Sequence, residues 1–149
     1  MEKKKRVVCW TGESFARRGA AERLLRQYPD FVPALNNLST ICGLEGRLDE
    51  ASATPQRALA HEPENVFALA NLITFYFRAA RLDDARAVAT RFATLRPKRD
   101  DAWAKMAEAL SYLGDDQGVL DVYRRAERAH ALDELATSAL LEHLPWLAA

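Results

Sequence analysis

Apolar residues recur along this chain with the period of an α-helix, in stretches separated by short turns. Near the middle of the chain, four of them stand at i, i+3, i+4 and i+7: Leu69, Leu72, Ile73 and Tyr76. That spacing places one apolar stripe on a helix of about three turns. A turn at 79–81 follows, and a second stripe begins at Leu82. The second helix must end before Pro97, because the residue before a proline disfavours helical backbone.

This two-helix unit repeats every 34 residues. One position of the repeat holds Arg23, Arg57, Arg91 and Arg125. The position at the turn holds Gly12, Gly46, Ala80 and Gly114, and a proline position holds Pro29, Pro63 and Pro97. Neither helix of a unit can cover its own apolar stripe, so the units must pack antiparallel and stack on one another. The sequence therefore predicts an all-α fold, an α-solenoid, as a single domain over residues 1–149.

The register divides the chain into full repeats at 32–65, 66–99 and 100–133. We expect residues 12–31 to supply the second helix of a partial N-terminal repeat, and 134–144 to form a C-terminal capping helix. Residues 1–11 fall where a first helix belongs, but Lys4 and Lys5 stand where apolar and small residues are required. We expect a short, frayed or displaced helix there, or a chain that is a fragment of a longer array.

Pro55 falls inside the second helix of the first full repeat. An interior proline removes one backbone hydrogen bond and clashes with the preceding turn, at a cost of about 3 kcal/mol or more. The sequence predicts either a kink at this point or a restarted helix, with Thr54 as its cap and Pro55 at its first position.

The pattern resembles the tetratricopeptide repeat (TPR), a 34-residue helix–turn–helix. The shared positions are bulky apolar at Leu35, Leu69 and Trp103 and at Leu38, Leu72 and Met106, small at Ser39 and Ala107, and alanine at Ala51 and Ala85. The resemblance implies a right-handed superhelix of antiparallel helix pairs, whose first helices line a concave groove. It also implies a non-enzymatic scaffold for protein–protein interaction, with a partner peptide or helix in that groove.

Carried over position by position, the groove presents amides, hydroxyls, a few charges and aromatic rings. Asn37 and Asn71 occupy equivalent positions, and an amide that donates and accepts can pair with a peptide unit without reading its side chain. Solvated asparagines are the alternative interpretation. We expect Asn71 and Arg78 to be exposed. The candidate groove residues are Asn36, Asn37, Thr40, Phe67, Asn71, Thr74, Phe77, Arg78, Asp101, Lys105, Glu108 and Tyr112.

Two narrower functions do not fit this face. A carboxylate clamp for the acidic tail of a heat-shock chaperone requires a basic residue where this chain has Asp101, and Asn36 and Thr40 also depart from its pattern. A related RNA-binding repeat requires a different spacing and a basic inner face, whereas Asp101 and Glu108 lie on this one. Lys plus Arg and Asp plus Glu both number 21, which leaves no global field to attract nucleic acid. We expect a protein or peptide partner.

Catalytic and cofactor chemistry is not indicated. The three histidines are dispersed, and neither metal-ligand spacing nor a glycine-rich phosphate loop occurs. The acidic pairs Asp83-Asp84 and Asp115-Asp116 fall at helix starts, where carboxylates favour the helix dipole. We expect no enzymatic activity, no cofactor and no metal site.

The apolar run 7–10 is far too short for a signal-peptide core or a membrane span. Cys9 and Cys42 form no closely spaced pair, so we expect a reduced, cytoplasmic chain with packed thiols; one long-range disulfide is the alternative. A second functional class also remains open. The poor N-terminal half-repeat, with Trp10 and Trp146 near the two ends, favours self-association or a structural role through the terminal faces.

Overall fold

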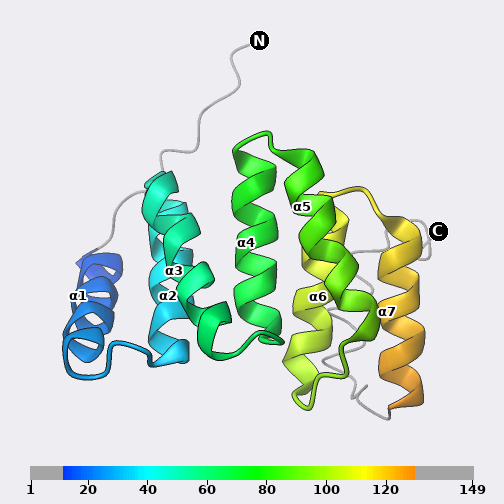
Figure 1. The fold of residues 1–149 in the computed structure, drawn as a ribbon, viewed down its shortest axis with the longest axis horizontal. Helices are drawn as coiled ribbons and strands as arrows, with labels where there is room; N and C mark the ends of the chain where they lie inside the picture. Colours follow the sequence, from blue (N-terminus) through cyan, green and yellow to red (C-terminus); the bar gives the residue numbers. More distant parts are fainter. Residues whose placement is uncertain (1–11, 130–149) are drawn as a thin grey trace.

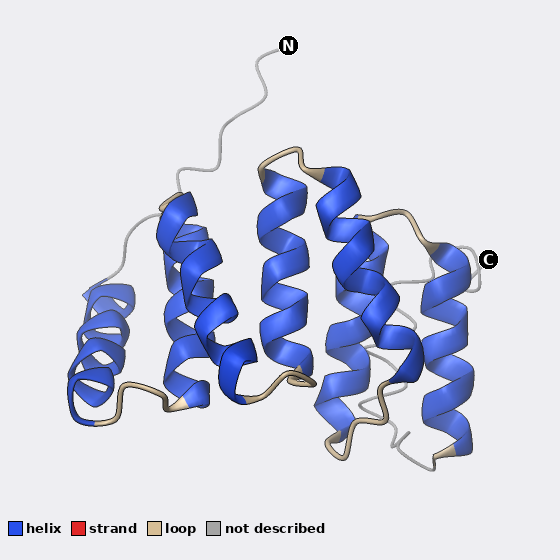
Figure 2. Ribbon diagram, viewed as in Figure 1, coloured by secondary structure: helices blue, strands red, loops and turns tan. Residues whose placement is uncertain are grey.

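The computed structural model of this chain describes residues 12–129, with side chains described from residue 15 onward. These residues form helices joined by short loops, and no strand occurs among them (Figure 2). The elements are α1 (Gly12–Gln27), α2 (Val32–Leu44), α3 (Leu48–His61), α4 (Val66–Arg78), α5 (Leu82–Ala89), the 3-10 helix η1 (Thr90–Thr94), α6 (Asp100–Tyr112) and α7 (Asp116–Arg128). The all-α expectation is confirmed for this part of the chain. The expectations for 1–11, for the capping helix 134–144, and for Trp10 and Trp146 lie outside the described residues.

The helices stand side by side, from α1 at one end of the long axis to α7 at the other (Figure 1). Each of α2, α4 and α6 packs against the helix that follows it, α3, α5 and α7 respectively. In addition, α4 contacts both α2 and α6. Apolar packing therefore continues from one helix pair to the next.

The core uses the repeat positions that the sequence marks as apolar. Leu69 and Ile73 of α4 are fully buried, and Trp103 of α6 is 1% exposed. Phe92 is also buried, so Trp103 and Phe92 are core residues, as expected. Leu59 packs against both apolar clusters of the described residues and so links them.

The turn inside each helix pair depends on one residue with left-handed backbone. These residues are Gly46, Ala80 and Gly114, with φ of 72°, 57° and 66°. After each of them, the next amide donates back to the carbonyl five residues earlier, as in the bond from Arg47 to Cys42 at 2.9 Å. This Schellman arrangement satisfies carbonyls at the end of the first helix. Glycine suits that backbone, whereas Ala80 adopts it at a steric cost.

The recurring arginine joins one repeat to the previous one. Arg57 donates to the backbone carbonyl of Pro29 at 2.7 Å, and Arg91 donates to that of Pro63 in the same way. Arg125 instead donates to the carbonyl of Phe92 at 3.0 Å. At each of these three positions the arginine therefore binds the backbone of the preceding unit.

Pro55 does not interrupt its helix, because α3 runs unbroken from Leu48 to His61. The expected restart at Thr54 is therefore wrong; a kink at Pro55 stays a prediction. Proline has no amide hydrogen, so the carbonyl of Ala51, four residues earlier, loses its usual helical donor. The hydroxyl of Ser39 on α2 donates to that carbonyl at 3.1 Å, and both residues are buried. The neighbouring helix thus compensates for the missing bond.

The acidic pairs lie at helix starts, as the sequence predicts. Asp115 is the N-cap of α7, and its carboxylate accepts from the amide of Gly118 at 2.9 Å. Asp83 and Asp84 lie in the first turn of α5. These carboxylates therefore serve the helix termini.

Candidate partner-binding groove

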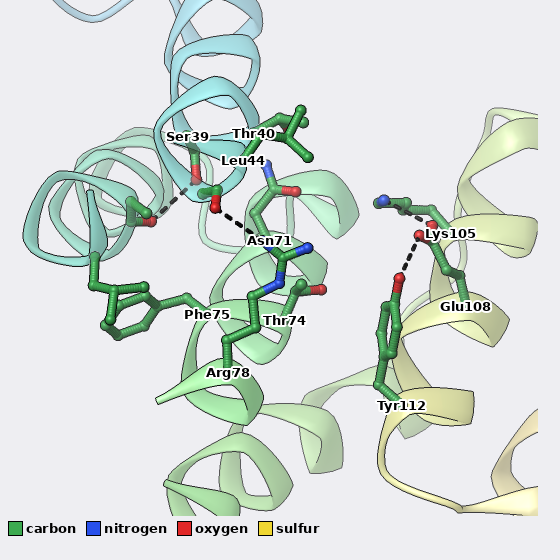
Figure 3. Close-up of a pocket in the computed structure, with 13 residues that line it drawn as sticks. Ser39, Thr40, Leu44, Asn71, Thr74, Phe75, Arg78, Lys105, Glu108 and Tyr112 are labelled. Atoms are coloured by element: carbon green, nitrogen blue, oxygen red, sulfur yellow. Dashed lines mark hydrogen bonds and ion pairs between the residues drawn. The ribbon is translucent and has the colours of Figure 1, made fainter. Parts of the chain in front are cut away.

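A cavity of about 190 Å³ lies among α2, α3, α4 and α6 (Figure 3). Seven of the predicted groove residues line it: Thr40, Asn71, Thr74, Arg78, Lys105, Glu108 and Tyr112. They come from three successive first helices, where residues at equivalent repeat positions face the same way. The structure therefore brings together more than half of the residues that sequence reasoning proposed.

On the α4 side, polar side chains tie α4 to α2. The amide nitrogen of Asn71 donates to the backbone carbonyl of Asn36 at 3.2 Å. The guanidinium of Arg78 donates to the carbonyl of Gly43 at 2.9 Å. Arg78 is exposed as expected, but Asn71 is half-buried, so the expectation of an exposed Asn71 is wrong. Packing between α2 and α4 partly covers the Asn71 side chain.

On the α6 side, a cation, a carboxylate and a phenol form a small network. The ammonium of Lys105 forms an ion pair with Glu108 at 2.7 Å, and the hydroxyl of Tyr112 donates to the other oxygen of Glu108 at 3.4 Å. Figure 3 shows these three side chains across the pocket from Arg78. The pocket therefore carries charges of both signs, which fits the mixed groove that the sequence indicates.

The two N-terminal candidates lie elsewhere. The amide nitrogen of Asn36 donates to the side-chain oxygen of Asn65, the N-cap of α4, at 3.1 Å. Asn37 is exposed and lines a different groove, between α1 and α2. Asn37 and Asn71 thus occupy equivalent repeat positions but do not share one cavity.

The remaining candidates, Phe67, Phe77 and Asp101, do not line the pocket. The guanidinium carbon of Arg99 lies 5.0 Å from the centre of the Phe67 ring. The same guanidinium donates to the carboxylate of Asp101 at 2.6 Å. Phe77 packs against Tyr112, with ring centroids 5.7 Å apart. Phe77 therefore extends the aromatic rim of the pocket, while Phe67 and Asp101 belong to a separate surface at the start of α4 and α6.

Sequence reasoning missed several residues that line the cavity: Ser39, Gly43, Leu44, Leu48, Ala51 and Phe75. The repeat contained a signal for one of them. Leu44 stands 34 residues before Arg78, which stands 34 before Tyr112, and all three line the pocket. Leu48 and Ala51 come from a second helix, so an assignment limited to first helices excluded them.

Cys42, which precedes the pocket-lining Gly43, behaves as a small apolar residue. It is free and fully buried. Burial, and after it the nearby carboxylate of Glu50, raise the pKa of its thiol to about 11. A thiol with so high a pKa is a poor nucleophile at neutral pH.

Neither a protein-family model nor a curated protein matches this chain. The likeness to the tetratricopeptide repeat therefore stays a prediction from the pattern. Across residues 12–129, no helix combines the length and apolar character that crossing a bilayer requires.

Proposed function

We propose that this chain is a tetratricopeptide-like α-solenoid that binds a peptide segment of a partner protein and has no catalytic role. Three features support the architecture: the 34-residue period, the packing of each first helix on its second helix, and the left-handed residue in each turn. A stack of such pairs presents one row of first helices along a single face, which suits an extended ligand.

The observation that carries the proposal is the cavity shared by α2, α4 and α6. At about 190 Å³ it is smaller than the roughly 300–1,000 Å³ of a typical small-molecule site. Such a pocket suits a side chain of a longer ligand that continues along the surface. Its amide, hydroxyl, guanidinium and carboxylate groups offer both donors and acceptors to a peptide backbone.

Two features of the lining groups favour binding without large reorganisation. Arg78 uses one nitrogen for Gly43, which leaves further donors of its guanidinium for a ligand. Lys105 and Glu108 hold each other in place and are each about one-third exposed. Side chains that are already ordered lose less conformational entropy when a ligand binds.

The test compares proteins captured from a native lysate by the wild-type chain and by matched variants. Lys105→Glu reverses a charge in the pocket, and Lys98→Glu reverses an exposed charge outside it. Tyr112→Ala removes the phenol ring that lines the pocket. We expect quantitative mass spectrometry to show at least a tenfold loss of the specific partner with Lys105→Glu and with Tyr112→Ala, and no loss with Lys98→Glu. Equal capture by all of the variants would show that the groove is not the binding site.

A further inference from the structure

A second groove, with a cavity of about 490 Å³, lies between α1 and α2. Among residues 12–129, α1 is the only second-type helix that lacks a first helix before it. Phe31 and Leu44 line the groove and are 44% and 58% exposed. Phe31 lines only this groove, whereas Leu44 also borders the pocket lined by α4.

The α1 wall of this groove repeats a wall that is covered elsewhere. Four residues of α1 line it: Arg17, Ala20, Ala21 and Leu24. Thirty-four residues later in α3 stand Ala51, Thr54, Pro55 and Ala58. All four of the α3 residues are buried, in a helix that packs closely on α2. On α1, by contrast, Ala20 is exposed and Leu24 is only half-buried.

The α2 wall shows the same relation. The residues of α2 that line the groove include Asn37, Thr40, Ile41 and Leu44. Their counterparts 34 residues later on α4 are Asn71, Thr74, Phe75 and Arg78. Those α4 residues line the junction with α2, and Asn71 and Arg78 hydrogen-bond to its backbone. The α1 wall therefore corresponds to the surface of α3 that packs on α2, and the α2 wall corresponds to the surface of α4 that packs on α2.

From this correspondence we infer that the groove between α1 and α2 is a seat for one α-helix, supplied by a different protein. The occupant lies where a first helix would stand, against α1 on one side and α2 on the other. It continues the stack that α2, α4 and α6 already form. This inference rests on the 34-residue correspondence of α1 with α3 and of α2 with α4. It therefore holds whether or not the pocket lined by α2, α3, α4 and α6 binds a peptide.

The chemistry of the seat defines the occupant. Its α1 wall is apolar or small at Ala20, Ala21 and Leu24 and carries one cation, Arg17, and its α2 wall adds the uncharged Asn37 and Thr40. An unpaired charge buried on such a surface carries a large desolvation cost. The occupant must therefore present an apolar stripe with small residues and without basic side chains, which would meet both the apolar wall and the cation of Arg17. The buried face of α2, which includes Leu35, Ser39 and Cys42, is the example within this chain.

Neither residues 1–11 nor a first helix of a second copy meets these requirements. In the register, Lys4 and Lys5 correspond to Leu38 and Ser39, and Ser39 is buried on α2. Two lysines at those positions would be forced against an apolar wall. The first helices α2, α4 and α6 of a second copy are already packed on their own partners. Such a copy would have to unfold one of them to fill the seat.

The first experiment uses a peptide with the sequence of residues 31–45, carrying Cys42→Ala and a fluorescent label. Fluorescence anisotropy measures its binding to the full chain, with a shuffled peptide as the control. We expect saturable binding that Ala20→Glu weakens at least tenfold, because the new carboxylate enters the seat. Phe15→Glu adds the same charge at an exposed position of α1 outside the groove lining, whose counterpart Asp49 on α3 is also exposed, and should change the affinity less than twofold. Absence of binding, or equal effects of the two substitutions, would overturn the inference.

The second experiment supplies the helix covalently. Residues 1–13 are replaced by a copy of residues 32–47, which places a first helix and its turn in register before α1. We expect the thermal midpoint to rise by several degrees, and Ala20→Glu to cancel that gain. An unchanged midpoint would show that the seat does not accept a helix.

Two further outcomes would assign the seat to another occupant. If a chain without residues 1–11 bound the peptide at least tenfold more tightly, the chain's own N-terminal segment would be the occupant. If light scattering showed a dimer that Ala20→Glu abolished, the occupant would come from a second copy. Either result would overturn the assignment to a different protein.

Discussion

The two faces of α4 show how one helix separates stability from recognition. One face carries Leu69 and Ile73, which are fully buried between neighbouring helices. The other carries Asn71, Thr74 and Arg78, which line the pocket. The residues of the two faces alternate along the same three to four turns, so only their direction around the helix axis distinguishes them.

The two faces of α4 contribute to the free energy of folding through different interactions. A buried aliphatic side chain contributes about 1.5–3 kcal/mol through removal from water. A hydrogen bond between side chain and backbone contributes about 0.5–1.5 kcal/mol net. Substitutions on the buried face should therefore change unfolding, and substitutions on the pocket face should change binding.

The largest expected effect is on the buried face. Leu69→Ala leaves a cavity against α6 and should lower the free energy of unfolding by about 2–5 kcal/mol. Phe77→Ala, on the same helix, removes a larger but 38% exposed side chain and should cost clearly less. Urea denaturation followed by circular dichroism measures both. Equal losses would show that the two faces of α4 do not divide in this way.

Cys42 lies near the pocket but is buried, so it should affect stability and not binding. The pH dependence of the free energy of unfolding tests this. Its pKa of about 11 in the folded chain exceeds the ordinary thiol value of 9.0, so folding favours the protonated thiol. The corresponding stability is fully present below pH 9 and is lost as the pH rises toward 11, by about 2–3 kcal/mol in total. Lysines and tyrosines titrate in the same range, so the measured quantity is the difference between wild type and Cys42→Ala. A constant difference from pH 8 to pH 11 would contradict the prediction.

Ser39 lines the pocket yet should matter for stability. Ser39→Ala leaves the carbonyl of Ala51 buried without its donor and should cost about 1–2 kcal/mol. Pro55→Ala restores an amide that can bond to this carbonyl, so Ser39→Ala should cost less in that background. A double-mutant cycle by chemical denaturation measures the coupling. Additive effects would show that the hydroxyl does not replace the bond that Pro55 removes.

Ala80 shows that an exposed residue contributes to stability when its backbone is constrained. Ala80→Gly should raise the free energy of unfolding by about 1 kcal/mol, because glycine adopts a φ of 57° without the steric cost. Ala79→Gly is the matched control: its φ is −80°, so the same change should destabilise slightly. Thermal unfolding distinguishes the two, and a loss of stability in both variants would contradict the explanation.

The sequence predicted the helix pairs and most of the pocket, because both depend on side-chain direction within regular helices. The stripe around Leu69 and the position of Arg78 follow from helical periodicity alone. Contacts between different helices were harder to predict from the sequence. The bond from Ser39 that keeps α3 continuous through Pro55 joins side chain and backbone of different helices, and no spacing rule reports it.

The end of the array limited the prediction in a different way. Asn37 and Asn71 are equivalent in sequence, but Asn71 meets a preceding first helix and Asn37 does not, among the described residues. A repeat pattern assigns both residues one environment, whereas the environment depends on the neighbouring unit. Equivalent positions therefore differ in environment at the N-terminal end of the described helices.

The smallest expected effect on stability comes from the pocket face itself. Arg78 is exposed, and its bond to Gly43 uses the end of a long side chain whose ordering has an entropic cost. Arg78→Ala should therefore change the free energy of unfolding by less than about 0.5 kcal/mol.

Binding should respond in the opposite way, because Arg78 presents a cation to the pocket opposite Tyr112. We expect Arg78→Ala to lose most of the partner that the wild-type chain captures. Arg86→Ala removes an exposed arginine of α5 that lies outside this pocket, and it should retain the partner. If Arg78→Ala melted several degrees lower and still captured the partner, the arginine would serve the joint between α2 and α4, and the division between the two faces of α4 would fail.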